Sequence, residues 1–317
     1  MSGLLIAIAA AALAGSGQVD EPAGTQVPDA EADTQVSGAD SVADSGADGP
    51  PLPQRAADSS ESLEVSFLAG VWLPRMVGKV ALDDGEIQVN DEFELNRSEA
   101  TLNLELAVRK NEFWELWFGG FDFSSTASGP FRGNGKSFGS LVLNNGTQYT
   151  SRFEMTSVAT DLSVAVWRPF ADGHAREQGA DNRNWNGRYI ADLRFCPQFG
   201  MRYIDVDHTV TTAGGTERAG GEWLAVYAGL LLEMDYRPQE RTWWLALLRI
   251  QGSFAAGPAL GGDGGTMWQV RAGATVQVTE ALGFMFGYRL VELNVENGGY
   301  TLDGGLQGLF VAGSLKF

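Results

Sequence analysis

The chain has 317 residues and a formal net charge of −18, with a single cysteine, Cys196, and two histidines. The negative charge argues against nucleic acid as a partner, because nucleic-acid binding uses a basic surface. One cysteine excludes an intrachain disulfide, and one cysteine with two histidines cannot form a Cys/His zinc site. We expect neither a metal ion nor another cofactor.

Residues 1–14 predict a secretory signal peptide. A short apolar run ends at Ala12-Leu13-Ala14, which has the small-x-small pattern of a cleavage site, although no Lys or Arg precedes the run. The run is shorter than the roughly 20 residues that a membrane-spanning helix needs. We therefore expect this segment to direct secretion.

Residues 15–62 predict a disordered acidic linker. From residue 19 to residue 62 the chain has ten acidic residues, one basic residue, Arg55, and no aromatic residue. Such a segment cannot bury enough apolar surface to offset the entropy lost on ordering. A plain tether is the simpler interpretation, and an interaction tail is the alternative.

Residues 63–317 show a two-residue alternation that predicts β-strands. In residues 267–280, apolar side chains from Trp268 to Val278 alternate with residues such as Gln269 and Arg271. The same alternation predicts ten strands, at about 63–74, 99–109, 112–123, 151–168, 188–206, 222–236, 241–255, 266–280, 282–296 and 305–317.

Two of these strands carry irregular features. Pro197 cannot donate to a ladder and predicts a bulge. In 282–296 the apolar parity switches at Leu293 and Val295, through either a bulge or emergence from the apolar layer.

The links between the predicted strands alternate in length. Those at 110–111, 237–240 and 281 are short, whereas those at 75–98, 124–150, 207–221 and 256–265 are long. Short turns at one end and long loops at the other are typical of a membrane barrel. The link 169–187 is long where a turn is expected, which indicates an insertion or a miscounted strand.

The apolar parity could face lipid or a protein core. A solvated sheet face should carry lysine, but the opposite parity has almost none, and aromatic residues such as Trp167 and Trp223 recur near strand ends. A soluble barrel or sandwich remains the alternative. The fold that we predict is all-β: a closed, antiparallel, up-and-down transmembrane β-barrel of about ten strands, with 8–12 possible.

If the apolar parity faces lipid, the polar parity directs charged side chains into one lumen. Buried charges must be paired, and arginine forms two hydrogen bonds with a carboxylate. We expect a lumen charge network of Glu105, Arg109, Glu115, Asp161, Arg194, Arg202, Glu233, Asp235, Arg249, Arg271 and Arg289.

The chain ends in GLFVAGSLKF, with Leu315 and Phe317 on one parity. This end resembles the C-terminal strand of Gram-negative outer-membrane β-barrels, although Gly313 lies one place from the usual register. Residues 200–203 (Gly-Met-Arg-Tyr) and 287–290 (Gly-Tyr-Arg-Leu) resemble strands of small OmpA-type barrels. The resemblance implies a barrel in the lipid bilayer of the cell outer membrane. It also implies that Phe317 and Leu315 form the signal read by the barrel-assembly machinery, and it implies no specific activity.

We expect a monomeric outer-membrane protein with a charge-filled lumen, a structural or surface-interaction role and no catalytic residue. A narrow ion or small-solute pore is the alternative. A further alternative is a rim hydrolase with His208 as its base. Asp207 is a poor partner for His208, because neighbours on a strand point to opposite faces, and a solvated loop histidine is the simpler interpretation.

Overall fold

The computed structural model describes residues 63–317 apart from 84, 111–112, 171–183, 186–187 and 241. The predicted signal peptide (1–14) and the predicted linker (15–62) lie outside the described residues. Within the part of the chain that is described, no helix is long and apolar enough to cross a membrane.

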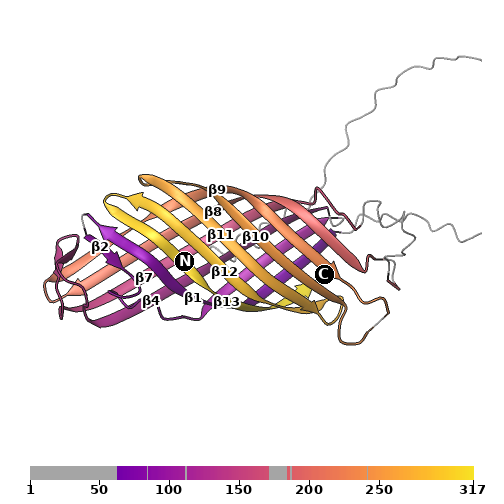
Figure 1. The fold of residues 1–317 in the computed structure, drawn as a ribbon, viewed down its shortest axis with the longest axis horizontal. Coiled ribbons are helices and arrows are strands. Elements are labelled where there is room, and N and C mark those ends of the chain that lie inside the picture. The colour runs from indigo at the N-terminus through magenta and orange to yellow at the C-terminus, as the bar shows by residue number, and fades with distance from the viewer. Residues whose placement is uncertain (1–62, 84, 111–112, 171–183, 186–187, 241) are drawn as a thin grey trace, which may run out of the picture. The chain divides into compact units, whose positions relative to one another are not determined.

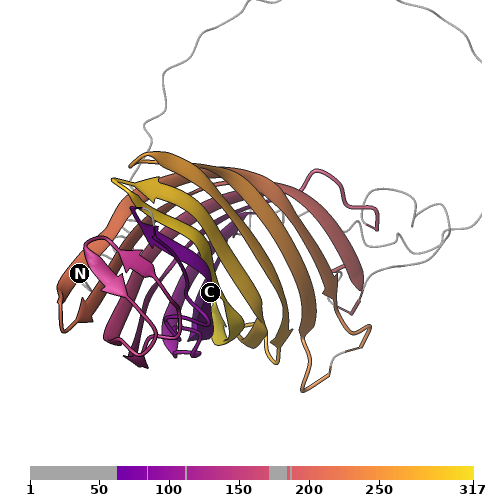
Figure 2. The ribbon, with the colours of Figure 1, turned by 60° about the vertical axis from the view of Figure 1, so that its left-hand side comes forward.

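The described chain forms a closed antiparallel β-barrel of ten strands, as the sequence predicts (Figure 1 and Figure 2). Each barrel strand pairs with the next, and the last pairs with the first. The barrel strands are β1 (Leu63–Leu82), β3 (Thr101–Lys110), β4 (Trp114–Pro130), β7 (Gln148–Val164), β8 (Ala191–Thr212), β9 (Gly215–Tyr236), β10 (Leu247–Leu260), β11 (Gly264–Gln277), β12 (Leu282–Asn297) and β13 (Tyr300–Lys316). Three short strands lie between them, namely β2 (Gly85–Gln88), β5 (Lys136–Phe138) and β6 (Leu141–Leu143).

The pairing of β1 with β13 closes the barrel. It runs from Ser66 opposite Lys316 to Leu82 opposite Tyr300. The backbone N–H of Phe317 also donates to the carbonyl of Val65 at 2.9 Å. Each barrel strand then has a neighbour on both sides over the length where β1, β3 and β4 pair. The sheet has no open edge there, which is what a lipid-spanning sheet requires.

The two faces of the strands differ in burial in the direction that the alternation predicts. Leu102 is 64% exposed on the outer surface, whereas Glu105 is 3% exposed. Val270 also faces outward, and its neighbour Gln269 is buried. The exposed apolar side chains form an apolar belt that includes Phe199, Met201, Val226, Leu230, Ile250, Phe254, Phe284, Phe286, Leu309 and Val311.

The strands extend further than predicted at the end of the barrel opposite Leu63 and Phe317, here called the plug end. The predicted loop 207–221 is wrong, because β8 and β9 continue through it to a two-residue turn. The predicted loop 256–265 shortens to residues 261–263. In this extension the alternation is inverted. The inward residues Val206 and Val210 are apolar and buried, while the outward residues are polar, so the strands continue beyond the belt.

The inversion explains the switch in 282–296. Leu293 and Val295 are fully buried on the inward face of β12, and the pairing of β12 with β11 runs without interruption from Gly264 to Gln277. Emergence from the apolar layer, not a bulge, is therefore the correct interpretation.

The opposite end, here called the turn end, also differs from the prediction. The link after β9 runs from residue 237 to residue 246, because β10 begins at Leu247 rather than near 241. Most of the long link 169–187 lies outside the described residues.

Pro197 marks a break in one ladder only. The pairing of β8 with β9 passes through it, with Pro197 opposite Leu230. The pairing with β7 stops at Ser163 opposite Gln198 and resumes at Trp167 opposite Phe195, with one extra residue on the β7 side. The predicted bulge therefore falls on the partner strand.

The apolar belt makes Leu230→Arg a direct test of the outward face. Leu230 lies near the middle of the belt on β9 and is 44% exposed. Placing a guanidinium in hydrocarbon should lower the free energy of unfolding by about 2–4 kcal/mol. Urea unfolding in phospholipid vesicles measures it. Thr150→Arg, on the outward face of the extension, is the control and should be near neutral. Equal effects of the two substitutions would refute the assignment of the belt.

Candidate functional site: the charged lumen, the apolar plug and the turn-end vestibule

The turn-end half of the lumen holds an arginine and carboxylate network. Asp235 is fully buried and accepts from Arg194 at 2.7 Å, from Arg249 at 2.7 Å and from Arg237 at 3.0 Å. Glu233 forms ion pairs with Arg194 and with Arg249, the latter at 3.4 Å. The alternation of β8, β9 and β10 brings these groups together, because it directs every second side chain inward.

Arg109 extends this network to the other wall. Its Nη2 lies 3.0 Å from Glu233 Oε2, and its Nε donates to Glu115 at 2.7 Å. Two further members were not predicted. Arg237 lies just past β9, and Asp192, which Arg168 contacts at 2.7 Å, begins the inward face of β8. Both residues have the inward parity of their strands, which could have identified them. Both lie at strand ends, where the sequence does not define the boundary of the strand.

The remaining predicted lumen residues lie nearer the plug end. Arg271 donates to Glu105 at 2.8 Å, and Glu105 also accepts from Asn103 at 2.8 Å. The other three, Asp161, Arg202 and Arg289, are buried and form no ion pair within 4.0 Å among the described residues. The structure thus brings the eleven predicted residues into one lumen but pairs only eight of them.

Side chains leave little space between these groups. Three cavities lie among the lumen side chains, with volumes of about 80, 60 and 10 Å³. Each is large enough for no more than a few water molecules.

Between the charged layers and the plug end, apolar side chains fill the barrel. Residues 85–95 and 131–147, which we call the apolar plug, contribute Ile87, Val89, Phe93, Leu95, Phe131, Phe138, Leu141 and Leu143, all buried. They pack against inward residues of the barrel wall, among them Phe153, Val206 and Leu302. Sequence reasoning treated both segments as outer loops. Their phenylalanines and leucines were the overlooked signal.

Polar contacts fix the plug to the barrel. Gly139 N–H donates to the carbonyl of Leu82 at 3.3 Å, and Ser140 N–H donates to Glu217 at 3.3 Å. Lys136 Nζ donates to the carbonyl of Glu86 at 2.7 Å. The first two contacts hold the β5–β6 hairpin against β1 and β9, and the third joins the two segments of the plug.

His208 belongs to this apolar region and not to a loop. It lies on the extension of β8, beyond the apolar belt, and is fully buried. Its Nε2 lies 2.8 Å from Ser151 Oγ, and its ring contacts Phe138 and Phe93 with centroids 5.0 and 5.5 Å apart. Burial lowers the pKa of His208 to about 3. The expectation of a solvated loop histidine is therefore wrong.

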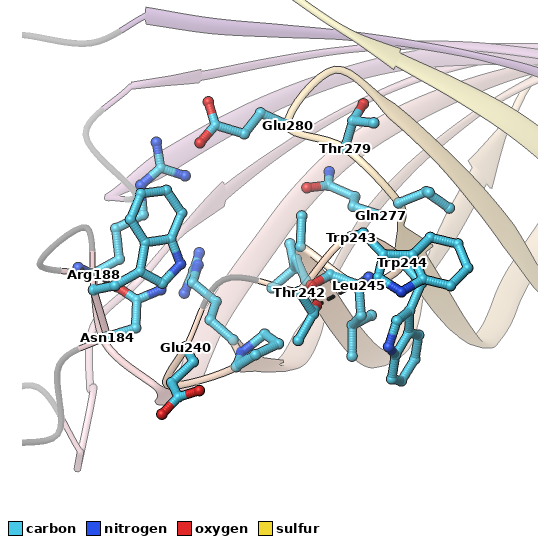
Figure 3. Close-up of a pocket in the computed structure, with 16 residues that line it drawn as sticks. Asn184, Arg188, Glu240, Thr242, Trp243, Trp244, Leu245, Gln277, Thr279 and Glu280 are labelled. Atoms are coloured by element: carbon cyan, nitrogen blue, oxygen red, sulfur yellow. Dashed lines mark hydrogen bonds between the residues drawn. The ribbon is translucent and has the colours of Figure 1, made fainter.

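The turn end of the lumen opens into a vestibule of about 740 Å³ (Figure 3). Trp243 and Trp244 stand on one side of it, and Asn184 and Arg188 on the other. Arg237 joins the vestibule to the charged network through Asp235. The volume is that of a small-molecule site.

Two C-terminal side chains carry the predicted assembly signal. Leu315 faces outward opposite Phe67, and Phe317 is 78% exposed at the turn end. Their role as a signal stays a prediction. Cys196 is buried on the inward parity of β8.

Removing one arginine from the network should be far more costly than removing one from the surface. Arg194→Leu leaves Glu233 and Asp235 short of a partner in the buried lumen, and should lower the free energy of unfolding by about 3–5 kcal/mol. Arg152→Leu, at an exposed pair with Glu154, should cost less than about 1 kcal/mol. Urea unfolding of both variants measures the difference. Equal losses would show that the network is not buried.

His208 should make the barrel sensitive to acid. Its ordinary pKa is 6.5 and its pKa in the fold is about 3, so below pH 6.5 protons bind to the unfolded chain in preference. The contribution of neutral His208 to the free energy of unfolding is complete above pH 6.5. It is lost as the pH falls, by about 2 kcal/mol at pH 5. Relative to the pH dependence of His208→Gln, the wild type should therefore weaken between pH 7 and pH 5. If the free energies of unfolding of the wild type and of His208→Gln depend on pH in the same way, His208 is not buried in its neutral form.

No protein-family model matches the sequence, and no curated protein matches it. Among solved structures, the chain is similar to Ail, the attachment invasion locus protein of Yersinia pestis, at 10% identity with a TM-score of 0.31, over 80% of this chain and 98% of that one. It is also similar to the transport unit of the autotransporter AIDA-I from Escherichia coli, at 9% identity with a TM-score of 0.32, over 84% and 92% of the two chains. A third similar structure is the Pseudomonas putida toluene transporter TodX, at 9% identity with a TM-score of 0.26, over 80% of this chain and 89% of that one. These TM-scores are all below 0.5, so we take neither a family nor a function from them, and the fold assignment rests on the strand pairing of this chain.

Proposed function

We propose that the chain is a monomeric outer-membrane β-barrel protein of a Gram-negative cell, with a closed lumen and a structural or surface-interaction role. One observation carries the proposal: the outer surface is a continuous apolar belt, while the arginines and carboxylates point inward. A soluble protein would expose the charges and bury the belt, because exposed apolar patches of this extent mark contact with lipid or with another protein.

The position of the aromatic residues supports a bilayer around the belt. Tyr203 and Tyr288 are exposed on outward positions of β8 and β12, and Tyr236 is exposed at the turn end of β9. Tyrosine has an apolar ring and a polar hydroxyl, which suits the boundary between hydrocarbon and water.

The apolar plug weighs against the narrow pore. An ion that passed from the charged layers to the plug end would have to cross the region of Phe93, Phe138 and Leu293, which are fully buried among apolar side chains. Transfer of an unpaired charge into such a region is very unfavourable. We therefore prefer a lumen that does not conduct.

The surroundings of His208 weigh against a rim hydrolase. A general base must reach the proton that it removes from a substrate or water. His208 and its partner Ser151 are both fully buried, and Asp207 instead forms an ion pair with Arg218 on the outer surface. We propose a structural role for His208 and no enzymatic activity.

The outward face of the extension offers a surface for interaction. On β4, β7, β8 and β9 it carries polar side chains, including Thr126, Thr150, Arg152, Thr211, Thr216 and Arg218, all exposed. The identification with OmpA-type barrels and the recognition of Phe317 by the barrel-assembly machinery remain predictions.

Planar-bilayer recording tests the closed lumen. The full chain, purified in detergent and reconstituted, should give no stepwise conductance, because the plug and the network block the path. In parallel, the protein should partition into detergent micelles and migrate faster on a gel before heating than after it. Stable single-channel steps would overturn the closed lumen, and a monodisperse protein in detergent-free buffer would overturn the membrane assignment.

A further inference from the structure

Three arginines line one cavity in the lumen, and the carboxylates around them do not balance their charge. Arg202, Arg271 and Arg289 line the cavity of about 60 Å³, together with Asp161 and Glu115. Of these, Arg271 is held by Glu105 at 2.8 Å, and Glu115 is held by Arg109 at 2.7 Å. Two carboxylates, Glu105 and Asp161, then remain for Arg202, Arg271 and Arg289, which leaves an excess of one positive charge.

Neutral groups hold the two remaining arginines. Arg202 is 1% exposed and donates to Ser157 Oγ at 2.9 Å and to Gln269 Oε1 at 2.7 Å. Arg289 is also buried. It donates to Asn103 Oδ1 at 3.3 Å and lies over the ring of Trp72 at 5.3 Å. A buried charge is most stable when an opposite charge and hydrogen bonds compensate it, so the excess positive charge here favours a bound counter-ion.

The cavity also has unused hydrogen-bond donors. The Nε–H groups of Arg202 and Arg271 have no partner in the structure, although both atoms are buried. The volume of about 60 Å³ is close to twice the roughly 30 Å³ that one water molecule occupies in the liquid. A monatomic anion of halide size therefore fits, with space for about one water molecule beside it.

Asp161 lies against the barrel wall. A Cβ added to Gly200 would lie 2.1 Å from Asp161 Oδ1 and 2.5 Å from Tyr227 Cε2. Asp161 and the Tyr227 ring thus occupy the space that the absent side chain leaves on the inward face of β8.

We propose that this cavity binds one monovalent anion of halide size, chloride in the cell, between the guanidinium groups of Arg202, Arg271 and Arg289. The ion supplies the missing negative charge and accepts from the unused Nε–H donors. Its binding site is built from β8, β11 and β12, so the ion stabilises the closed barrel.

Thermal unfolding of the full chain in detergent tests the site in solution. At equal ionic strength, the unfolding temperature should be higher in sodium chloride or sodium bromide than in sodium gluconate, because gluconate is too large for the cavity. Arg202→Gln should abolish the difference. Asp161→Asn removes the competing charge and should lower the half-saturating chloride concentration several-fold. Arg152→Gln, at an exposed pair, is the matched control and should keep the wild-type difference.

Crystals grown in sodium bromide test the position of the ion. An anomalous bromide peak inside the cavity is expected. If Arg202→Gln does not fold, the chloride dependence of Asp161→Asn and the bromide peak still test whether the cavity binds an anion. Equal unfolding temperatures in chloride and gluconate, with no bromide peak in the cavity, would show that water fills it and would overturn the proposal.

Discussion

The backbone pairing between β1 and β13 is the constraint on which the rest of the structure depends. A sheet surrounded by apolar groups has no water to satisfy its edge amides, so it must close on itself. Closure over the full length from Ser66 to Leu82 joins the first and last described strands, which are far apart in the sequence. It also divides space into an outside and an inside. The two parities of each strand then acquire opposite environments.

That division explains why the charges of this chain lie where they do. In the proposed bilayer an arginine on the outer parity would meet hydrocarbon, whereas on the inner parity it meets carboxylates from other strands. Asp235 shows the result, since three arginines converge on it: one from β8, one from β10 and one from the start of the link after β9. Each charge in such a network is stable only in the presence of the others, so the network rigidifies the barrel and leaves no wide path through it.

At the plug end the distribution of side chains is reversed: polar side chains face outward and apolar side chains face inward. Beyond the belt the outside is water, so polar residues such as Thr150 face outward. The inside then loses its charges and is filled by Val206, Leu302 and the plug aromatics. The barrel strands thus continue beyond the belt and surround a conventional apolar core. His208 lies in this second region, which is why it is buried without a carboxylate partner.

The sequence by itself determined the ten strands, their outward and inward parities, and most of the lumen charges, but not Asp192 and Arg237 at the strand ends. These follow from local alternation, because a side chain's face depends only on its position along its own strand. Pairing within the lumen, the plug and the unbalanced cavity around Arg202 were decided only by the tertiary structure. Which arginine meets which carboxylate depends on the relative register of several strands, and the burial of Phe93 and Phe138 depends on segments folding back into the barrel. Neither is a property of neighbouring residues in the chain.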